Sequence, residues 1–109
     1  MGVTNTKLFT PKQNEMAALV KAMGHPARIA ILEHLLDVNA CIGMEIVEKI
    51  PLAQPTISRH LKELKDAGLI QGDVEGTRIH YCINKERWQE VQDLFNEFFD
   101  KHLPKEGCD

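Results

Sequence analysis

The sequence has no apolar run that approaches the roughly 18–20 residues needed to cross a bilayer, and no apolar secretion signal near its start. Cysteine is scarce: there are three, an odd number, which does not fit a framework of paired disulfides. From these absences we expect a cytoplasmic protein that makes no contact with membranes and keeps its thiols reduced.

Motifs for catalysis are missing as well. The chain contains no nucleophile elbow, no glycine-rich phosphate loop, no carboxylate pair at a catalytic spacing and no His-Glu-x-x-His metal motif. Its 109 residues leave room for one domain and one core, and we find no internal repeat or interdomain linker. We therefore predict a single domain over residues 10–103, with flexible termini at 1–9 and 104–109 and no enzymatic activity.

The net charge of -3 argues at first against a nucleic-acid partner, because binding to phosphates favours a basic surface. The charges are unevenly distributed, however. Residues 86–109 hold seven acidic and three basic side chains, whereas residues 54–65 hold Arg59, Lys62 and Lys65 against Glu63 alone. A local positive surface in the middle of the chain therefore keeps DNA binding open.

Two helices are predicted in the first third of the chain from the 3.6-residue spacing of apolar side chains. The first begins with the cap signal Thr10-Pro11 and ends at Gly24. The second begins at His25-Pro26. Its predicted buried stripe consists of Ile29, Leu32, Leu35 and Leu36.

A tight pair of shorter helices follows. The first runs from about Gly43 to Ile50, where Pro51 ends it, and the second begins near Gln54 and ends at Gly68. After Gly68 the period changes to that of two strands, 69–74 and 77–83, with a tight turn between them at Glu75-Gly76.

The helical period returns from Lys85 to His102. One broad apolar face of this last helix consists of Trp88, Val91, Leu94, Phe95, Phe98 and Phe99. The element order is therefore α-α-α-α-β-β-α, mostly α-helical with a small β-hairpin. A tight helix pair followed by a hairpin is the plan of a winged helix-turn-helix, whose second short helix can lie in the major groove of DNA.

Residues 54–67 form the predicted recognition helix, and residues 69–83 the wing. With side chains placed at about 100° intervals, Ile57, Leu61 and Leu64 share the inward face, while Arg59 and Lys62 point the opposite way, together with Pro55 and Asp66. The alternative interpretation of this segment is an ordinary solvated amphipathic helix.

Each polar residue of the helix suits a different part of DNA. Arg59 is placed to make a bidentate contact with a base edge, guanine above all. Gln54, Thr56 and Ser58 lie at the helix N-terminus, where their side chains and the free N–H groups suit phosphates. His60 borders the inward face, so we predict a half-buried packing residue and not a base reader.

Three segments of the chain resemble motifs of one family. Residues 54–70 (QPTISRHLKELKDAGLI) resemble the recognition helix of the arsenical-resistance repressors, the ArsR/SmtB type of bacterial metalloregulator. Residues 24–28 (GHPAR) resemble the start of that family's second helix, and residues 76–81 (GTRIHY) its wing. The resemblance covers about residues 15–99. It implies a homodimeric repressor that sits on a palindromic operator of double-stranded DNA and leaves it when an inducer binds, with Arg78 of the wing touching the backbone or minor groove.

The first and last helices supply apolar side chains for such a dimer, because the last helix has more aromatics than so small a core can cover. The predicted interface consists of Met16, Leu19, Val20, Met23, Trp88, Phe95, Phe98 and Phe99. The alternative is that this stripe only closes the core of the monomer.

The resemblance is weakest at the sites where members of the family bind a metal inducer. Metal sensors of the family often carry Cys-x-Cys near the third helix, but here the segment is Cys41-Ile42-Gly43, which has one thiol. The family's other common site needs Asp-x-His and later His and acidic ligands on the last helix, which instead has Lys85-Glu86-Arg87-Trp88 and a single late histidine, His102.

His80 and Cys82 share one face of a strand, and together with Cys41 they are candidate ligands. A single buried cysteine is the alternative for each thiol. Because a stable zinc site needs three or four protein ligands, we expect no bound metal or other cofactor, and zinc or arsenite uptake no better than that of a Cys41→Ser variant. A thiol-based redox response of Cys41, Cys82 or Cys108 stays open.

A different class of function is also consistent with the pattern. A winged helix can serve as a protein–protein interaction module without sequence-specific DNA binding, and the acidic net charge favours this alternative. The basic residues Arg59, Lys62 and Arg78 favour DNA. Binding to non-specific DNA at low salt separates the two functions.

Overall fold

A computed structural model describes residues 8–38, 41–43, 45–75, 78–101 and 103–104 of the chain. Most of the predicted flexible termini, residues 1–7 and 105–109, therefore lie outside the described residues. The element order matches the predicted one: α1 (Pro11–Met23), α2 (Pro26–Val38), α3 (Glu45–Lys49), α4 (Gln54–Asp66), β1 (Ile70–Glu75), β2 (Arg78–Ile83) and α5 (Lys85–Phe99). None of the helices in the described part of the chain is long and apolar enough to cross a membrane.

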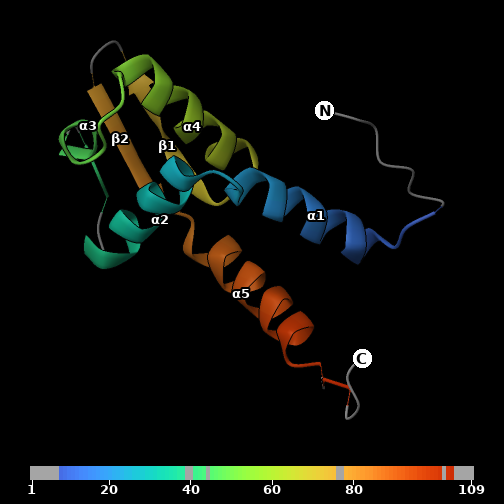
Figure 1. The fold of residues 1–109 in the computed structure, drawn as a ribbon. Coiled ribbons are helices and arrows are strands. Elements are labelled where there is room, and N and C mark those ends of the chain that lie inside the picture. Colours follow the sequence, from blue (N-terminus) through green and yellow to red (C-terminus); the bar gives the residue numbers. More distant parts are fainter. Residues whose placement is uncertain (1–7, 39–40, 44, 76–77, 102, 105–109) are drawn as a thin grey trace.

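The winged helix-turn-helix forms the body of the molecule, from which α1 and α5 extend (Figure 1). The helices α2, α3 and α4 lie around the two-stranded antiparallel hairpin, in which Ile70 pairs with Ile83 and Glu75 with Arg78. The predicted turn at Glu75-Gly76 falls partly on residues 76–77, outside the described part. The architecture is therefore the predicted mostly α-helical winged helix.

Local sequence explains where the main helices begin and end. At the start of α1, the Thr10 hydroxyl accepts a hydrogen bond from the Gln13 N–H, and the Gln13 side chain accepts one from the Thr10 N–H. After α4, Gly68 adopts a positive φ of 82°, and the N–H groups of Gly68 and Leu69 donate to the carbonyls of Lys65 and Leu64. This is a Schellman cap, which a glycine at that position favours, and it turns the chain directly into the wing.

The core lies between α4, α2 and the hairpin. From α4, Ile57, Leu61 and Leu64 are completely buried, as the helical spacing predicted. The described core cluster consists of Leu19, Ile31, Leu32, Leu35, Ile42, Ile50, Ile57, Leu61, Leu64, Leu69, Ile70, Ile79, Tyr81 and Val91.

The predicted buried stripe of α2 was wrong at two positions. Leu32 and Leu35 are buried, but Ile29 and Leu36 are exposed, and Ile31 is buried in their place. Because apolar residues occur on every side of α2, their spacing does not define a single stripe, and the position of α4 decides which face is covered. The last helix also ends at Phe99 and not at His102, which lies outside the described residues.

Candidate nucleic-acid interface and cysteine cluster

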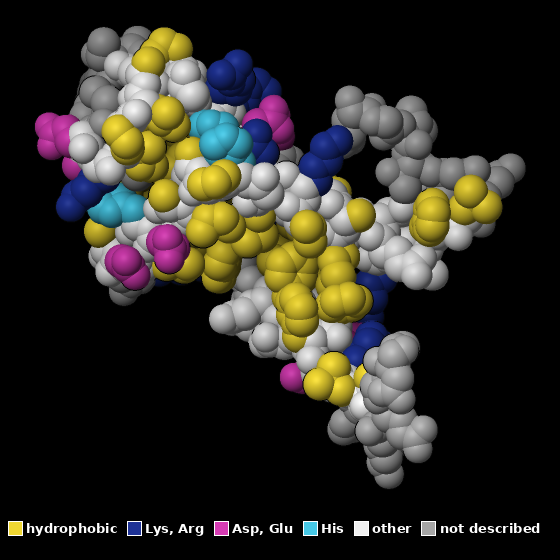
Figure 2. Space-filling model, in the orientation of Figure 1, with side chains coloured by type: hydrophobic (Ala, Val, Ile, Leu, Met, Phe, Trp, Pro, Cys, Tyr) yellow, Lys and Arg dark blue, Asp and Glu magenta, His cyan; other side chains and the backbone are white. Residues whose placement is uncertain are grey.

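Helix α4 carries most of the predicted DNA-binding residues. Pro55, Arg59 and Lys62 are exposed, whereas Gln54, Thr56 and Ser58 are half-buried near the start of the helix. Lys and Arg side chains stand at the α4 end of the molecule in the space-filling view (Figure 2). The structure thus brings six of the seven predicted DNA-binding residues onto one helix. The seventh, Arg78, lies in β2, and its side chain is outside the described part.

The cations on α4 differ in their neighbours. Lys62 Nζ lies 2.9 Å from Asp66 Oδ2, a hydrogen bond that raises the pKa of Lys62, and Lys65 Nζ lies 3.3 Å from Asp73 Oδ1 in the wing. Arg59 forms no hydrogen bond or ion pair with any residue that the structure describes. Since exposed ion pairs contribute little to stability, phosphates can compete for both lysines. Arg59 is exposed as well.

His60 is a packing residue, as predicted, but it is buried and not half-buried. It is 7% exposed, and its Nδ1 accepts a hydrogen bond of 3.1 Å from Arg28 Nε. Its ring lies 4.3 Å from that of His25, and Arg28 also donates to the Ala22 carbonyl. Burial lowers the pKa of His60, and so do the neighbouring His25 and Arg28. The neutral ring therefore joins α4 to α2, and Arg28 in turn joins α2 to the end of α1.

The residues predicted for the dimer interface fall into three groups by their exposure. Leu19 belongs to the core of the monomer, a correction to its predicted place on a partner surface, because α1 packs this side chain inward. Val20, Phe98 and Phe99 are exposed. The remaining predicted residues are half-buried: Met16, Met23, Trp88 and Phe95.

Two ion pairs join α1 to α5. Arg87 Nη1 lies 2.9 Å from Glu15 Oε2, and Lys12 Nζ lies 2.7 Å from Glu97 Oε1. Beside the second pair lies a groove of about 450 Å³, whose apolar lining includes Met16, Leu94 and Phe98. Figure 2 shows hydrophobic side chains gathered over α5. The two helices therefore present an apolar surface outside the winged-helix body.

The cysteines contradict one prediction. Cys41 and Cys82 form a disulfide, whereas the odd cysteine count led us to expect reduced thiols. Cys108 lies outside the described residues. The disulfide borders a groove of about 480 Å³ that Leu36 and Trp88 also line.

A strand-like contact explains this pairing. The N–H of Ile42 donates to the Tyr81 carbonyl, and the N–H of Tyr81 donates to the Ile42 carbonyl, so residues 41–43 lie antiparallel to β2. The next residue pair in this register is Cys41 and Cys82, with Cα atoms 4.2 Å apart. Residues opposite each other at such a non-hydrogen-bonded position have their side chains closest together. Sequence spacing could not reveal this contact, because it joins residues 41 positions apart.

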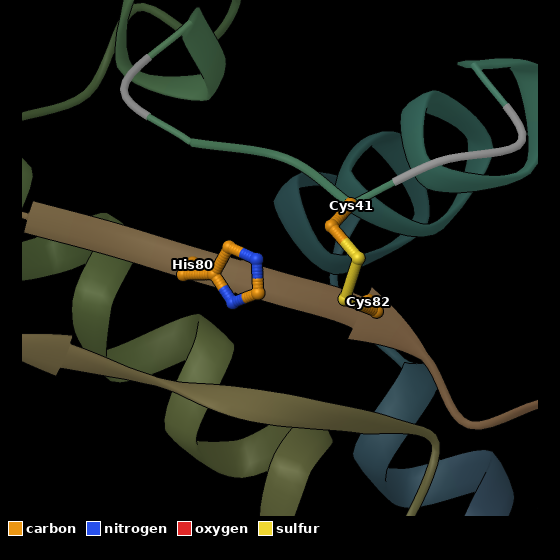
Figure 3. A group of neighbouring side chains, drawn as sticks. All are labelled: Cys41, His80 and Cys82. Atoms are coloured by element: carbon orange, nitrogen blue, oxygen red, sulfur yellow. A yellow bond between two sulfur atoms is a disulfide. The ribbon is translucent and has the colours of Figure 1, made fainter.

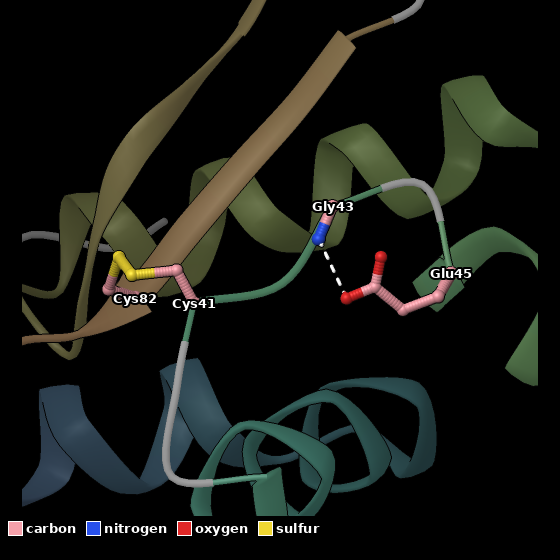
Figure 4. Close-up of a disulfide and its surroundings, with 4 residues drawn as sticks. All are labelled: Cys41, Gly43, Glu45 and Cys82. Carbon is pink, nitrogen blue, oxygen red and sulfur yellow. Dashed lines mark hydrogen bonds between the residues drawn. A yellow bond between two sulfur atoms is a disulfide. The ribbon is translucent and has the colours of Figure 1, made fainter.

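A carboxylate holds the far end of the same segment. Glu45 Oε1 accepts a 2.9 Å hydrogen bond from the Gly43 N–H, as Figure 4 shows beside the disulfide. This bond, together with one from its own backbone N–H, lowers the pKa of Glu45. The segment that leads into α3 is therefore attached at Cys41, at Ile42 and at Gly43.

Known proteins resemble this chain in both sequence and fold. Residues 25–71 match the family described as "Bacterial regulatory protein, arsR family". An uncharacterized HTH-type transcriptional regulator of Methanocaldococcus jannaschii is 36% identical over 86 residues, which cover 79% of this chain and 97% of that protein. The arsenical resistance operon repressor of Staphylococcus xylosus is 31% identical over 95 residues, 86% of each chain. The crystal structure of the transcriptional repressor BigR from Xylella fastidiosa is 25% identical, with a TM-score of 0.59 over 91% of this chain and all of that one.

Proposed function

The chain belongs to the ArsR family of DNA-binding transcriptional regulators, and from this premise we propose that it is a dimeric repressor of a palindromic operator. The observation that carries the proposal is the division of α4 into two faces. Ile57, Leu61 and Leu64 attach the helix to the core, and this leaves Arg59 and Lys62 turned outward. Such a helix can enter a major groove without any change in the body of the protein.

The residues of α4 and the wing have separate roles in this proposal. Arg59 reads a base edge, whereas Gln54, Thr56, Ser58 and the Lys62 ammonium hold phosphates and fix the register of the helix. Arg78 of the wing touches the backbone or minor groove beside it, as the resemblance to the family implies. No catalytic role is part of the proposal, and the place of action is the cytoplasm, where the DNA is.

The dimer is supported by the apolar surface of α1 and α5. Val20 is 53% exposed, Phe98 49% and Phe99 75%, and these side chains adjoin the half-buried Met16 and Phe95. Contiguous exposed apolar patches on small proteins usually mark interaction sites. A twofold arrangement through these helices would repeat α4 on a second half-site, which is why we propose a palindromic operator.

The test is titration of the protein with labelled duplex DNA taken from upstream of its own gene. Arg59→Ala should weaken specific binding by about 1–3 kcal/mol, a factor of roughly 5–150 in Kd, because it removes a bidentate base contact. The thermal midpoint should stay nearly unchanged, since the side chain is exposed.

The matched control is Lys21→Ala, which removes one positive charge from an exposed position on α1. It should leave the affinity for the operator close to that of the wild type. Equal operator affinity of the Arg59 variant and the wild type would remove Arg59 from base reading. Failure of the wild type to bind any duplex even at low salt would favour the alternative, a winged helix used only for protein contacts.

A further inference from the structure

Three side chains with metal-binding atoms meet where residues 41–43 lie along β2. The sulfur atoms of Cys41 and Cys82 and a ring nitrogen of His80 all lie within 4.8 Å of one another. Figure 3 shows the imidazole of His80 beside the two sulfurs, on the same side of the strand. Cys41 and His80 are exposed and Cys82 is half-buried, so the cluster is open to ions from solvent.

The register of the strands produces this cluster. Because Cys41 lies opposite Cys82, the position opposite His80 is Gly43. Side chains two residues apart on a strand share a face, so His80 and Cys82 project together. Gly43 contributes no side chain to this cluster, and a Cβ at this position would lie 3.2 Å from Glu45 Oε2. The second thiol that the segment around Cys41 lacks is thus supplied by the neighbouring strand.

We propose that reduction of the Cys41–Cys82 disulfide creates a site for one thiophilic divalent cation, bound by both thiolates and by the imidazole of His80. Two sulfur ligands and one nitrogen ligand are a set that zinc takes, with metal–ligand distances of about 2.0–2.3 Å. Ligand atoms that lie within 4.8 Å of one another can be reached by one ion after small side-chain rotations. Three protein ligands leave a fourth position for water.

The disulfide and the metal site exclude each other. A dithiol reductant converts the disulfide into two thiols and is itself oxidised to a disulfide, with transfer of two electrons and two protons. Binding of a divalent cation then displaces the two thiol protons, which makes affinity fall with falling pH. Oxidation of the pair removes both sulfur ligands at once.

Glu45 is not a member of this site. Its carboxylate is bound to the Gly43 N–H, and it does not belong to the group of ligand atoms around the two sulfurs. The ligand set of the site therefore contains two sulfurs and one nitrogen and no carboxylate. A cation that prefers oxygen ligands, such as Mg²⁺, is not expected to bind there.

The test uses the full-length protein, reduced with a phosphine and freed of reductant and metal. Titration with Zn²⁺ against a chromophoric chelator should show one ion bound per chain, and titration with Co²⁺ should give sulfur-to-metal charge-transfer absorption. Cys41→Ser and Cys82→Ser should each lose stoichiometric uptake, and His80→Ala should weaken binding and alter the cobalt spectrum. The wild type with its disulfide intact should bind neither ion.

Cys108→Ser is the matched control, because it removes the third thiol of the chain, which is not in the proposed ligand set. It should bind zinc as the wild type does. Loss of uptake in Cys108→Ser, or uptake that does not depend on Cys82 and His80, would overturn the proposed ligand set. Reduced wild type that binds zinc no better than Cys41→Ser would overturn the site itself. None of these measurements involves DNA, so their outcome is separate from that of the operator titration.

Discussion

Helices α4 and α5 are both amphipathic, but only α4 has its apolar face completely covered by its own chain. In α4, Ile57, Leu61 and Leu64 are fully buried against α2 and the hairpin. In α5 only Val91 is buried, and Phe98 and Phe99 remain exposed at the far end. The comparison indicates that the apolar face of α4 is buried within the monomer, whereas α5 leaves exposed the apolar side chains that we propose for the dimer interface.

The largest expected effect concerns the covered helix. Leu61→Ala should lower the free energy of unfolding by about 2–5 kcal/mol, because it removes a completely buried side chain and leaves a cavity. Denaturant unfolding followed by circular dichroism measures this loss. The exposed neighbour Glu63→Ala is the control and should change the free energy by less than about 0.5 kcal/mol. Equal losses in the two variants would contradict the burial of this face.

A substitution in α5 is expected to cause loss of the proposed dimer and little loss of stability. Phe98→Asp should convert the dimer to monomer, because the interface would have to bury a charge, while unfolding of the monomer changes by only about 0.5 kcal/mol. Sedimentation across a concentration series measures the dissociation. Gln89→Asp adds the same charge on the polar side of α5 and should leave the dimer intact. A wild type that sediments as a monomer at micromolar concentration would refute the interface.

The smallest expected effect is a pH dependence of stability that arises from His60 in α4. Burial lowers the pKa of His60 below its usual value, so its neutral form is favoured in the folded protein. Its contribution to stability is therefore complete above the unfolded-state pKa of about 6.5, and is lost as the pH falls through the folded-state pKa. His60→Asn does not titrate and can still accept from Arg28, so its stability should vary less with pH in this window. Parallel curves for variant and wild type would contradict this role.

The sequence analysis was correct for features that depend on residues close together in the chain. The inward stripe of α4 and the cap at Thr10 depend on residues within a few positions of each other, and both are present in the structure. It failed at α2, where Ile29 and Leu36 were assigned to the core, because apolar residues lie on all its sides. It also failed at Cys41, whose disulfide partner is set by the register of Ile42 against Tyr81. Local spacing contains no information about that register.

The same pair of residues, Ile42 and Tyr81, determines how the hairpin can move. Two backbone hydrogen bonds join the wing to the segment that leads into α3, so the hairpin cannot tilt without moving that segment or breaking both bonds. The position of the wing relative to the segment before α3 is thus set by hydrogen bonds within the protein itself. On the proposed operator, a duplex whose grooves do not fit this arrangement would have to bend or twist, so we expect operators that deform easily to be favoured even at base pairs that the protein never touches.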